Sequence, residues 1–416
     1  MNQPIPNQPF IAIACGGTGG HLFPGLAVAE ELKQRGCAVA LLISPKEVDQ
    51  QAVKSASGME ILTLPAVGLQ NRNYFSFALS FWRSWRTARK FFKLCPPQAV
   101  LAMGGFTSAP PVLAAKKSGA RTFLHESNTI PGRANRFLAQ FVDVAFVGFP
   151  EAASRLDTRK TIVTGTPVRP QFKPRDPAVC RTALGLEPDR PVILVVGGSQ
   201  GASGLNRMIL SALPLLAGKN WQWLHLTGSA DFKKVKAAYA AHGLKAVVKP
   251  FLMEMDLALG AATACVSRSG ASSLAEIAAM RLPSLLVPYP VAADNHQLSN
   301  AMTFASAGAA KVLEEKNARP ETIAALIGGL VEDSALRDTM QAALVPWHAP
   351  GSAAQIAEAV YKIAVEPGQS ARFSAPVAGK TGGSQHPTTG PARVFGGWLL
   401  LSLLSLSAGV PGWLQA

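Results

Sequence analysis

The 416-residue sequence has few cysteines, and none is placed like a metal ligand or part of a disulfide framework. The five are scattered singly, without a CxxC pair: Cys15, Cys37, Cys95, Cys180 and Cys265. This spacing excludes the usual zinc and disulfide patterns and indicates a reducing environment. The first ten residues, MNQPIPNQPF, also lack the charged start and apolar stretch of a secretory signal. We therefore expect the protein to stay inside the cell.

Acidic residues are scarce as well. The chain has 25 Asp and Glu against 40 Lys and Arg, which gives a formal net charge of +15. Such an excess predicts an anionic partner, and nucleic acid, a phosphate-bearing substrate and an anionic membrane surface all fit. Outside residues 69–93, no arginine-aromatic stripe of the kind that stacks on bases occurs, so we expect no nucleic-acid partner.

No uncharged apolar run reaches the roughly 20 residues that usually span a bilayer. The longest candidate, VFGGWLLLSLLSLSAGV at 394–410, has seventeen residues and follows a stretch rich in Pro, Gly, Ser and Thr. That stretch, which starts at about residue 365, is typical of a flexible linker that cannot pack a core. A membrane-inserted tail and an incidental extension both remain open for the apolar run.

What the sequence does contain is a repeated order of strand, glycine turn and helix, which is typical of parallel βαβ units. It begins with FIAIAC at 10–15, with AVLAMGGF at 99–106 and with PVILVVGGSQGA at 191–202. In the first unit, Pro24 suits a first helical turn and Gly36 the helix end. Proline and charge concentrate at 165–190, where we place the interdomain link. The sequence thus predicts an α/β protein with two Rossmann-like domains facing across a cleft, 1–168 and 169–364, followed by the linker and tail at 365–416.

The glycine turns suggest phosphate binding. A glycine loop between a strand and a helix exposes N–H groups at the positive end of the helix dipole, although one such loop can also be a purely structural turn. The first loop, GGTGGH, ends in His21, whose imidazole can accept a proton from a sugar hydroxyl. The alternative is that His21 only caps the helix or binds phosphate.

Polar residues cluster in three further segments, of which the first two follow predicted strands. His125, Glu126 and Asn128 lie where doubly wound sheets place ligand contacts. In CVSRSGASSLAEIAAM, Arg268 precedes a turn whose N–H groups can hold a diphosphate, and Glu276 can accept both ribose hydroxyls. N-capping serines with a solvated glutamate would explain the same pattern. A final polar cluster can bind sugar hydroxyls or cap a helix: Asp294, Asn295, His296 and Gln297.

Residues 69–93 carry six basic residues and no acid. At helical spacing, one face collects Phe77, Phe81, Trp85, Ala88, Phe91 and Phe92, which can pack on the domain. The opposite face mixes basic and large apolar side chains, which suits an anionic lipid interface; burial of the apolar ones by neighbouring loops is the alternative. The predicted membrane surface comprises Phe75, Leu79, Trp82, Arg83, Arg86, Arg89 and Lys90.

Read together, the motifs resemble the MurG-type peptidoglycan glycosyltransferases. The resemblance covers about residues 10–364 and rests on GGTGGHLFPGLAVAEEL, MGGFTSAPPVLAA, LHESNTIPGRANR, GTPVR, VVGGSQGASGLN, SRSGASSLAEIAAMRLPSLLVPYP and DNHQLSNA. It implies a GT-B fold and transfer of N-acetylglucosamine from UDP-N-acetylglucosamine to the 4-hydroxyl of N-acetylmuramoyl-pentapeptide on undecaprenyl pyrophosphate, with inversion. It also implies a role in cell-wall biogenesis, cell shape and division, at the cytoplasmic face of the bacterial inner membrane.

Carried over by motif, the resemblance implies His21 as the candidate base. The implied donor contacts are Thr18, Gly19, Gly20, Asn128, Arg169, Ser199, Leu252, Ala271, Ser272, Ser273, Leu274, Ala275, Glu276 and Gln297. The acceptor pyrophosphate is assigned to Gly16, Gly17, Gly104 and Gly105. No metal or cofactor is expected, and other cell-wall synthesis proteins are expected partners. Thr166 and His296 depart from residues common in the family, which weakens the carry-over there.

Two other functions remain open from the sequence. One is another GT-B activity, on a glycolipid or as a UDP-sugar epimerase. The other is a non-catalytic sugar-nucleotide-binding or membrane-scaffolding subunit. Transfer assays with a lipid-linked acceptor separate these alternatives.

Overall fold

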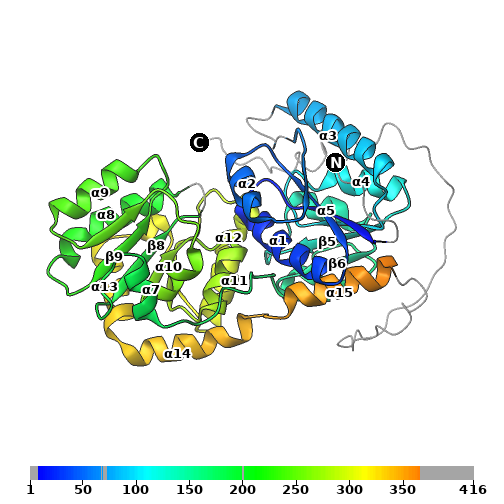
Figure 1. The fold of residues 1–416 in the computed structure, drawn as a ribbon. Coiled ribbons are helices and arrows are strands. Elements are labelled where there is room, and N and C mark those ends of the chain that lie inside the picture. The colour runs from blue at the N-terminus through cyan, green and yellow to red at the C-terminus, as the bar shows by residue number, and fades with distance from the viewer. Residues whose placement is uncertain (1–7, 67, 69–72, 199–200, 366–416) are drawn as a thin grey trace, which may run out of the picture.

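The computed structural model describes residues 8–66, 68, 73–198 and 201–365. The predicted linker and apolar tail beyond residue 365 therefore lie outside the described residues. The described chain forms two α/β domains side by side, blue to cyan and green to yellow in Figure 1, with a late helix that returns to the first domain.

The N-terminal domain is built on a seven-stranded parallel sheet in the order β3-β2-β1-β4-β5-β6-β7. Its strands are β1 (Phe10–Ala14), β2 (Ala38–Ile43), β3 (Glu60–Thr63), β4 (Ala99–Ala102), β5 (Arg121–Glu126), β6 (Val144–Val147) and β7 (Thr161–Val163). Its helices are α1 (Gly19–Gln34), α2 (Glu47–Ala52), the short helix η1 (Val53–Ser55), α3 (Tyr74–Leu94), α4 (Ala109–Lys117), α5 (Arg133–Ala139) and α6 (Pro150–Ala153).

Both faces of this sheet are covered, which explains why its strands are apolar without alternation. In β1, Ile11 and Ile13 pack in the cluster that includes α1, whereas Ala12 and Ala14 pack in the cluster that includes α3 and α4. The period of two along the strand thus supplies both layers.

The C-terminal domain repeats the plan with a six-stranded parallel sheet in the order β10-β9-β8-β11-β12-β13. Its strands are β8 (Val192–Val196), β9 (Gln222–Leu226), β10 (Ala246–Lys249), β11 (Ala264–Ser267), β12 (Ser284–Leu286) and β13 (Lys311–Val312). Its helices are α7 (Pro177–Ala183), α8 (Ser203–Leu216), α9 (Phe232–Ala241), α10 (Met255–Ala261), α11 (Ala271–Ala279), η2 (Ala293–Asn295), α12 (His296–Ser306), η3 (Glu315–Asn317), α13 (Pro320–Glu332), α14 (Ser334–Leu344) and η4 (Val345–Trp347).

The three predicted units of strand, glycine turn and helix are present as β1-α1, β4-α4 and β8-α8. Gly36 follows the end of α1 with a φ of +80°, as its helix-ending role predicts. The prediction for Pro24 is wrong, because α1 begins at Gly19 and Pro24 lies inside it. The region 165–190 is not a bare link either, since it contains α7, which packs against α10.

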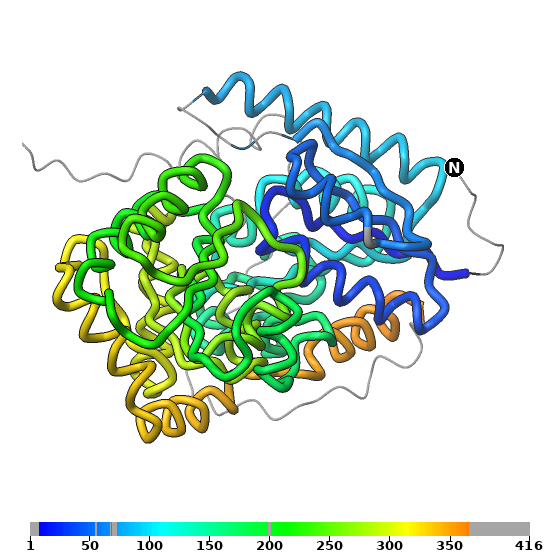
Figure 2. The backbone as a smooth tube through the Cα atoms, turned by 60° about the vertical axis from the view of Figure 1, so that its left-hand side comes forward, coloured from blue at the N-terminus to red at the C-terminus, as the bar shows by residue number. Residues whose placement is uncertain are grey.

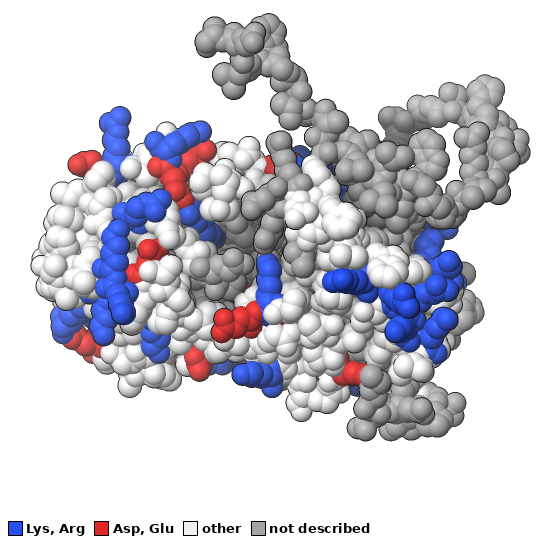
Figure 3. Space-filling model, turned by 90° about the horizontal axis from the view of Figure 1, so that it is seen from above, with Lys and Arg blue, Asp and Glu red and all other residues white. Residues whose placement is uncertain are grey.

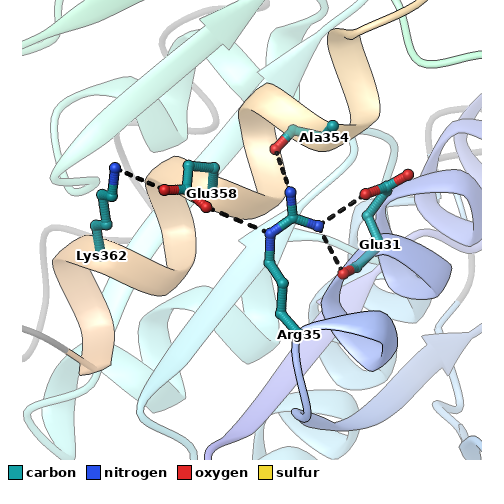
Figure 4. A network of polar contacts seen from close by, with 5 residues as sticks. All are labelled: Glu31, Arg35, Ala354, Glu358 and Lys362. Carbon is teal, nitrogen blue, oxygen red and sulfur yellow. Dashed lines mark hydrogen bonds and ion pairs between the residues drawn. The ribbon is translucent and has the colours of Figure 1, made fainter.

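The last described helix, α15 (Ser352–Val365), packs against α1 and not against the C-terminal sheet, although sequence order assigned most of it to that domain. Ile356 and Val360 of α15 are fully buried in the core beside α1. At the edge of the contact between α1 and α15, Arg35 donates hydrogen bonds to Glu31, to Glu358 and to the carbonyl of Ala354, as Figure 4 shows. The described part of the chain therefore crosses between the domains twice, and the orange helix lies under the first domain in Figure 1.

Helix α3 runs along the outside of the N-terminal domain, at the top of Figure 1. Ala88, Phe91 and Phe92 are buried against the domain, as predicted, whereas the side chain of Phe75 is 81% exposed and that of Trp82 is 50% exposed. Seen from above in Figure 3, Lys and Arg side chains gather over the right-hand end of the molecule. Within the described residues, no helix is long and apolar enough to cross a membrane.

Candidate active site

A cavity of about 2850 Å³ lies between the two domains and is lined by residues of both. Each sheet reverses its strand order at one point, between β1 and β4 in the first domain and between β8 and β11 in the second. The helices that follow such neighbouring strands run to opposite faces, which leaves a crevice at the carboxyl ends of the strands. The helix starts of α1, α8 and α11 border this cavity.

On the N-terminal side, the start of α1 presents Thr18, Gly19, Gly20 and His21 to the cavity. Nδ1 of His21 and Oγ1 of Thr18 share a hydrogen bond of 3.1 Å. A Cβ atom at Gly104 or Gly105 would lie only about 3 Å from the imidazole, at 3.0 and 2.9 Å respectively. The two glycines therefore let the ring rest on their backbone, and both need the positive φ that glycine adopts easily.

Burial lowers the pKa of His21 to about 4, although Asp49 opposes the shift. The free imidazole is therefore the dominant form at neutral pH. A general base must start the reaction unprotonated, so the ring has the protonation state that proton abstraction requires.

The glycine loop before α1 is held from inside by Asp49. The Asp49 carboxylate, fully buried, accepts a hydrogen bond from the N–H of Gly17 at 2.7 Å and one from the hydroxyl of Ser44 at 2.5 Å. The N–H of Gly104 is likewise engaged, by Ser108 Oγ at 3.1 Å. The N–H groups of Gly17 and Gly104 are therefore not free to meet a phosphate in this structure. Among the four glycines assigned to the acceptor pyrophosphate, Gly105 lines the cavity, whereas Gly16, Gly17 and Gly104 are buried.

On the C-terminal side, α11 points its start into the cavity, with Gly270 as N-cap. The N–H of Leu274 already binds the carbonyl of Gly270 at 3.0 Å, and the Leu274 side chain is in the core. The free N–H groups of the first turn therefore belong to Ala271, Ser272 and Ser273, which line the cavity. These three are suited to a diphosphate. Leu274 and Ala275 are not among the described residues that line the cavity, and the contacts assigned to them stay predictions.

Glu276 of α11 and Arg169 of the link after β7 both line the cavity, and their charges interact. The Arg169 guanidinium lies over the Phe23 ring at 4.4 Å and the Phe172 ring at 5.0 Å, with its Nε buried and without a partner among the described residues. Burial raises the pKa of Glu276 to about 7, and Arg169 partly offsets the rise. Both groups are thus partly desolvated.

Replacement of Glu276 by glutamine is expected to raise the free energy of unfolding above pH 7, on the order of 1 kcal/mol for a half-buried carboxyl. The folded-state pKa lies above the unfolded one, so ionisation costs stability as pH rises through the interval from about 4.5 to 7. The advantage of Gln should therefore vanish near pH 4. Chemical denaturation at pH 4 and pH 8 measures it, and an equal difference at both would show that burial is not the cause.

The two helix starts touch each other across the cavity floor. Ser272 Oγ, from α11, donates to the carbonyl of Gly20 in α1 at 3.0 Å. Within an α-helix this carbonyl would accept from the N–H four residues later, but that residue is Pro24, which has none. Pro24 therefore leaves the Gly20 carbonyl free to accept a hydrogen bond from the other domain.

Sequence comparisons agree with this geometry. The Glycosyltransferase family 28 N-terminal domain model matches residues 11–147, and the C-terminal domain model matches residues 192–360. A UDP-N-acetylglucosamine--N-acetylmuramyl-(pentapeptide) pyrophosphoryl-undecaprenol N-acetylglucosamine transferase of Mesorhizobium japonicum is 37% identical over 85% of this chain and 95% of its own. The enzyme of that name from Lactiplantibacillus plantarum is 32% identical over 83% and 97%. The chain belongs to this transferase family.

Solved structures confirm the GT-B architecture of this family-28 glycosyltransferase. The crystal structure of Acinetobacter baumannii MurG matches with a TM-score of 0.65 and 27% identity over 85% of this chain and 99% of that one. UGT2 of Phytolacca americana, complexed with UDP-2-fluoro-glucose and pterostilbene, matches with a TM-score of 0.61 over 85% and 99%. At 15% identity, the second match concerns the fold alone.

In this family-28 chain, the predicted donor residues Leu252 and Gln297 also line the cavity. The Gln297 side chain already accepts from the N–H of Tyr289 at 3.0 Å, which leaves its amide N–H groups for a ligand. Asn128 lines the cavity too, but its side chain is held by Glu126 at 3.0 Å and by Asn300 at 3.0 Å. Ser199 lies outside the described residues, and the contacts assigned to all these residues stay predictions.

His125 does not belong to the cavity. It is fully buried at the end of β5, where Nε2 lies 3.0 Å from the carbonyl of Gly165. Two relevant residues escaped the sequence analysis: Asp49, which organises the glycine loop, and Asn300, which joins the domains. Asp49 follows a strand without any distinguishing motif, but Asn300 lies three residues after Gln297, a spacing that places both on one side of α12.

Proposed function

We infer that the chain transfers N-acetylglucosamine from UDP-N-acetylglucosamine to the 4-hydroxyl of N-acetylmuramoyl-pentapeptide on undecaprenyl pyrophosphate, converting lipid I to lipid II. Membership of the transferase family carries this conclusion. The cavity supports it, because its lining brings together the His21 imidazole, the free start of α11 and the Arg169 guanidinium.

In the proposed reaction, the acceptor 4-hydroxyl attacks the anomeric carbon from the face opposite UDP. The bond from the anomeric carbon to the β-phosphate oxygen breaks, the new glycosidic bond forms with inversion, and the hydroxyl proton passes to His21. UDP leaves with the electron pair of the broken bond. The N–H groups at the start of α11 and the Arg169 guanidinium stabilise its charge, so we propose that no metal is needed.

The testing experiment measures UDP release by purified protein with UDP-N-acetylglucosamine and a soluble lipid I analogue, with mass analysis of the product. We expect UDP release that depends on the acceptor, together with a disaccharide product. Binding of the donor without UDP release would indicate a non-catalytic subunit. An altered UDP-sugar formed without acceptor would indicate an epimerase.

We further propose that the exposed face of α3 binds an anionic membrane surface, so that the enzyme works as a peripheral protein. On this face, Arg86 lies over the Trp82 ring at 5.3 Å, and the neighbouring Arg83 and Lys90 are exposed. Basic groups beside exposed aromatic rings suit the boundary between lipid headgroups and acyl chains. The cavity reaches this helix, since Phe77, Phe81 and Trp85 are part of its lining.

Charge reversal on α3, Arg83→Glu, Arg86→Glu and Lys90→Glu, is expected to weaken binding to phosphatidylglycerol vesicles by at least ~100-fold, at about 1 kcal/mol per lost basic residue. Vesicle co-sedimentation measures the effect. The matched control reverses three exposed lysines of α9, Lys233, Lys234 and Lys236, on the other domain. Equal losses in both variants would mean that net charge, and not the α3 surface, attracts the protein to lipid.

A further inference from the structure

Asn300 joins the two domains beside the cavity. It lies on α12 in the C-terminal domain, and its side chain is fully buried. It is not among the described residues that line the cavity, so a direct contact with substrate is not its role. Its partners nevertheless come from both walls of the active site.

The side-chain amide of Asn300 uses its complete hydrogen-bonding capacity. Oδ1 accepts from the backbone N–H and the hydroxyl of Thr129, both at 3.0 Å. Nδ2 donates to Asn128 Oδ1 at 3.0 Å and to the carbonyl of Ser269 at 3.2 Å. A backbone N–H on one side and a backbone carbonyl on the other fix the amide orientation, because neither contact survives a flip.

Each partner leads to a substrate-facing group. Asn128 is held from its other end by Glu126, whose carboxylate also accepts from the Gly132 N–H at 2.9 Å and so shapes the loop after β5. Ser269 directly precedes Gly270, the N-cap of α11, and its hydroxyl donates to the carbonyl of Gln297 at 2.8 Å. One amide thus connects the loop of the first domain with the phosphate-facing helix of the second.

We propose that Asn300 is a positioning residue that fixes the two walls of the active site against each other in the closed cleft. The inference rests on the proposed transfer reaction, because it concerns the approach of acceptor and donor. The four hydrogen bonds set the position of Asn128 relative to the start of α11. A displacement of about 1 Å between reacting groups costs on the order of 100-fold in rate.

The loss of this amide acts on closure and not on the fold of either domain. In the closed cleft, removal of the side chain leaves the Thr129 N–H and the Ser269 carbonyl buried and unpaired, which is costly. Separation of the two domains would let water reach the Thr129 N–H, because Thr129 and Asn300 belong to different domains. The free-energy change therefore shifts the population toward the open form, while each sheet keeps its own core.

Replacement of Asn300 by alanine is expected to lower kcat with the lipid I analogue by ~100-fold. The Kd for UDP should change less than about twofold, since the start of α11 and Glu276 are intact. The matched control is Thr303→Ala, on the same helix, whose hydroxyl donates to the carbonyl of Ser299. Its kcat should equal that of the unchanged protein.

A double-mutant cycle with Asn128→Ala separates positioning from a general loss of structure. If Asn300 acts through Asn128, then Asn300→Ala should cost little more in the Asn128→Ala background. A full ~100-fold loss in both backgrounds would overturn the inference, as would an unchanged kcat in Asn300→Ala. Should the alanine variant fail to fold, Asn300→Asp keeps the shape and the acceptor for Thr129 but places an oxygen against the Ser269 carbonyl, and the same loss of kcat is expected.

The outcomes also separate this inference from the proposed function. If the unchanged protein releases no UDP with the lipid I analogue, the transfer reaction itself is refuted. If the unchanged protein is active and Asn300→Ala matches it, the reaction stands and only the positioning role fails.

Discussion

Replacement of His21 by alanine is expected to lower kcat by ~10²- to 10⁴-fold, the range that a positioned general base contributes. The Kd for UDP should remain the same, because the phosphate-facing N–H groups lie on α11 in the other domain. Burial keeps the pKa of His21 at about 4, so its free base is present throughout the neutral range. The acid limb of kcat/KM for the free enzyme should therefore not contain a His21 titration above about pH 5, one unit from that pKa.

His21→Gln sharpens this test, since glutamine keeps a hydrogen-bonding side chain but cannot take the proton. It should be as impaired as the alanine variant. His242→Ala provides the matched control, because His242 is an exposed histidine at the end of α9. If His21→Ala retains full turnover with unchanged donor affinity, His21 has no part in the chemistry.

Replacement of Arg169 by methionine is expected to lower kcat/KM for the donor by ~10²- to 10³-fold, as the loss of one preorganised charge-stabilising group does. Methionine keeps apolar contact with Phe23 and Phe172 but removes the charge that faces the departing diphosphate. Because Arg169 lowers the pKa of Glu276, its loss should raise that pKa further above 7 and leave the carboxyl protonated at neutral pH. Part of the lost donor affinity should then return as the pH is raised through this higher pKa and the carboxyl ionises.

Steady-state kinetics across this pH range measure both effects. Arg190→Met is the control, since Arg190 precedes β8 at the opposite end of the sheet and pairs with Glu187 at 3.1 Å. Arg169→Lys should recover only part of the activity, because a point charge does not reproduce a planar guanidinium stacked between rings. Unchanged donor kinetics in Arg169→Met would remove the residue from the donor site.

The sequence predicted the two sheets and the location of the cleft because local signals determine them. Apolar runs, glycine turns and helix periods lie within 20 to 30 residues, and parallel topology then places the turns on one edge. The interior of the glycine loop was not predictable in this way. Asp49, 32 residues away in the sequence, accepts a hydrogen bond from the Gly17 N–H. The sequence suggested that this N–H is free to bind phosphate, whereas in the fold it is already paired.

The contacts between domains were the least accessible to sequence analysis. Pro24 was assigned to a helix start from its usual preference, whereas the structure places it inside α1, where its missing N–H leaves the Gly20 carbonyl to Ser272. Asn300 was part of a recognised motif but received no role, because its partners belong to a loop 171 residues earlier. Such pairs become visible only once both domains are placed.

The return of α15 to the first domain means that the two lobes cannot be separated by a single cut. An isolated N-terminal fragment ending before α7 would expose the apolar patch on α1 and its sheet that Ile356 and Val360 cover. A fragment comprising the C-terminal domain would carry α15 with its apolar face exposed to solvent. Each domain has its own sheet, but each would expose apolar residues if it were produced without the other.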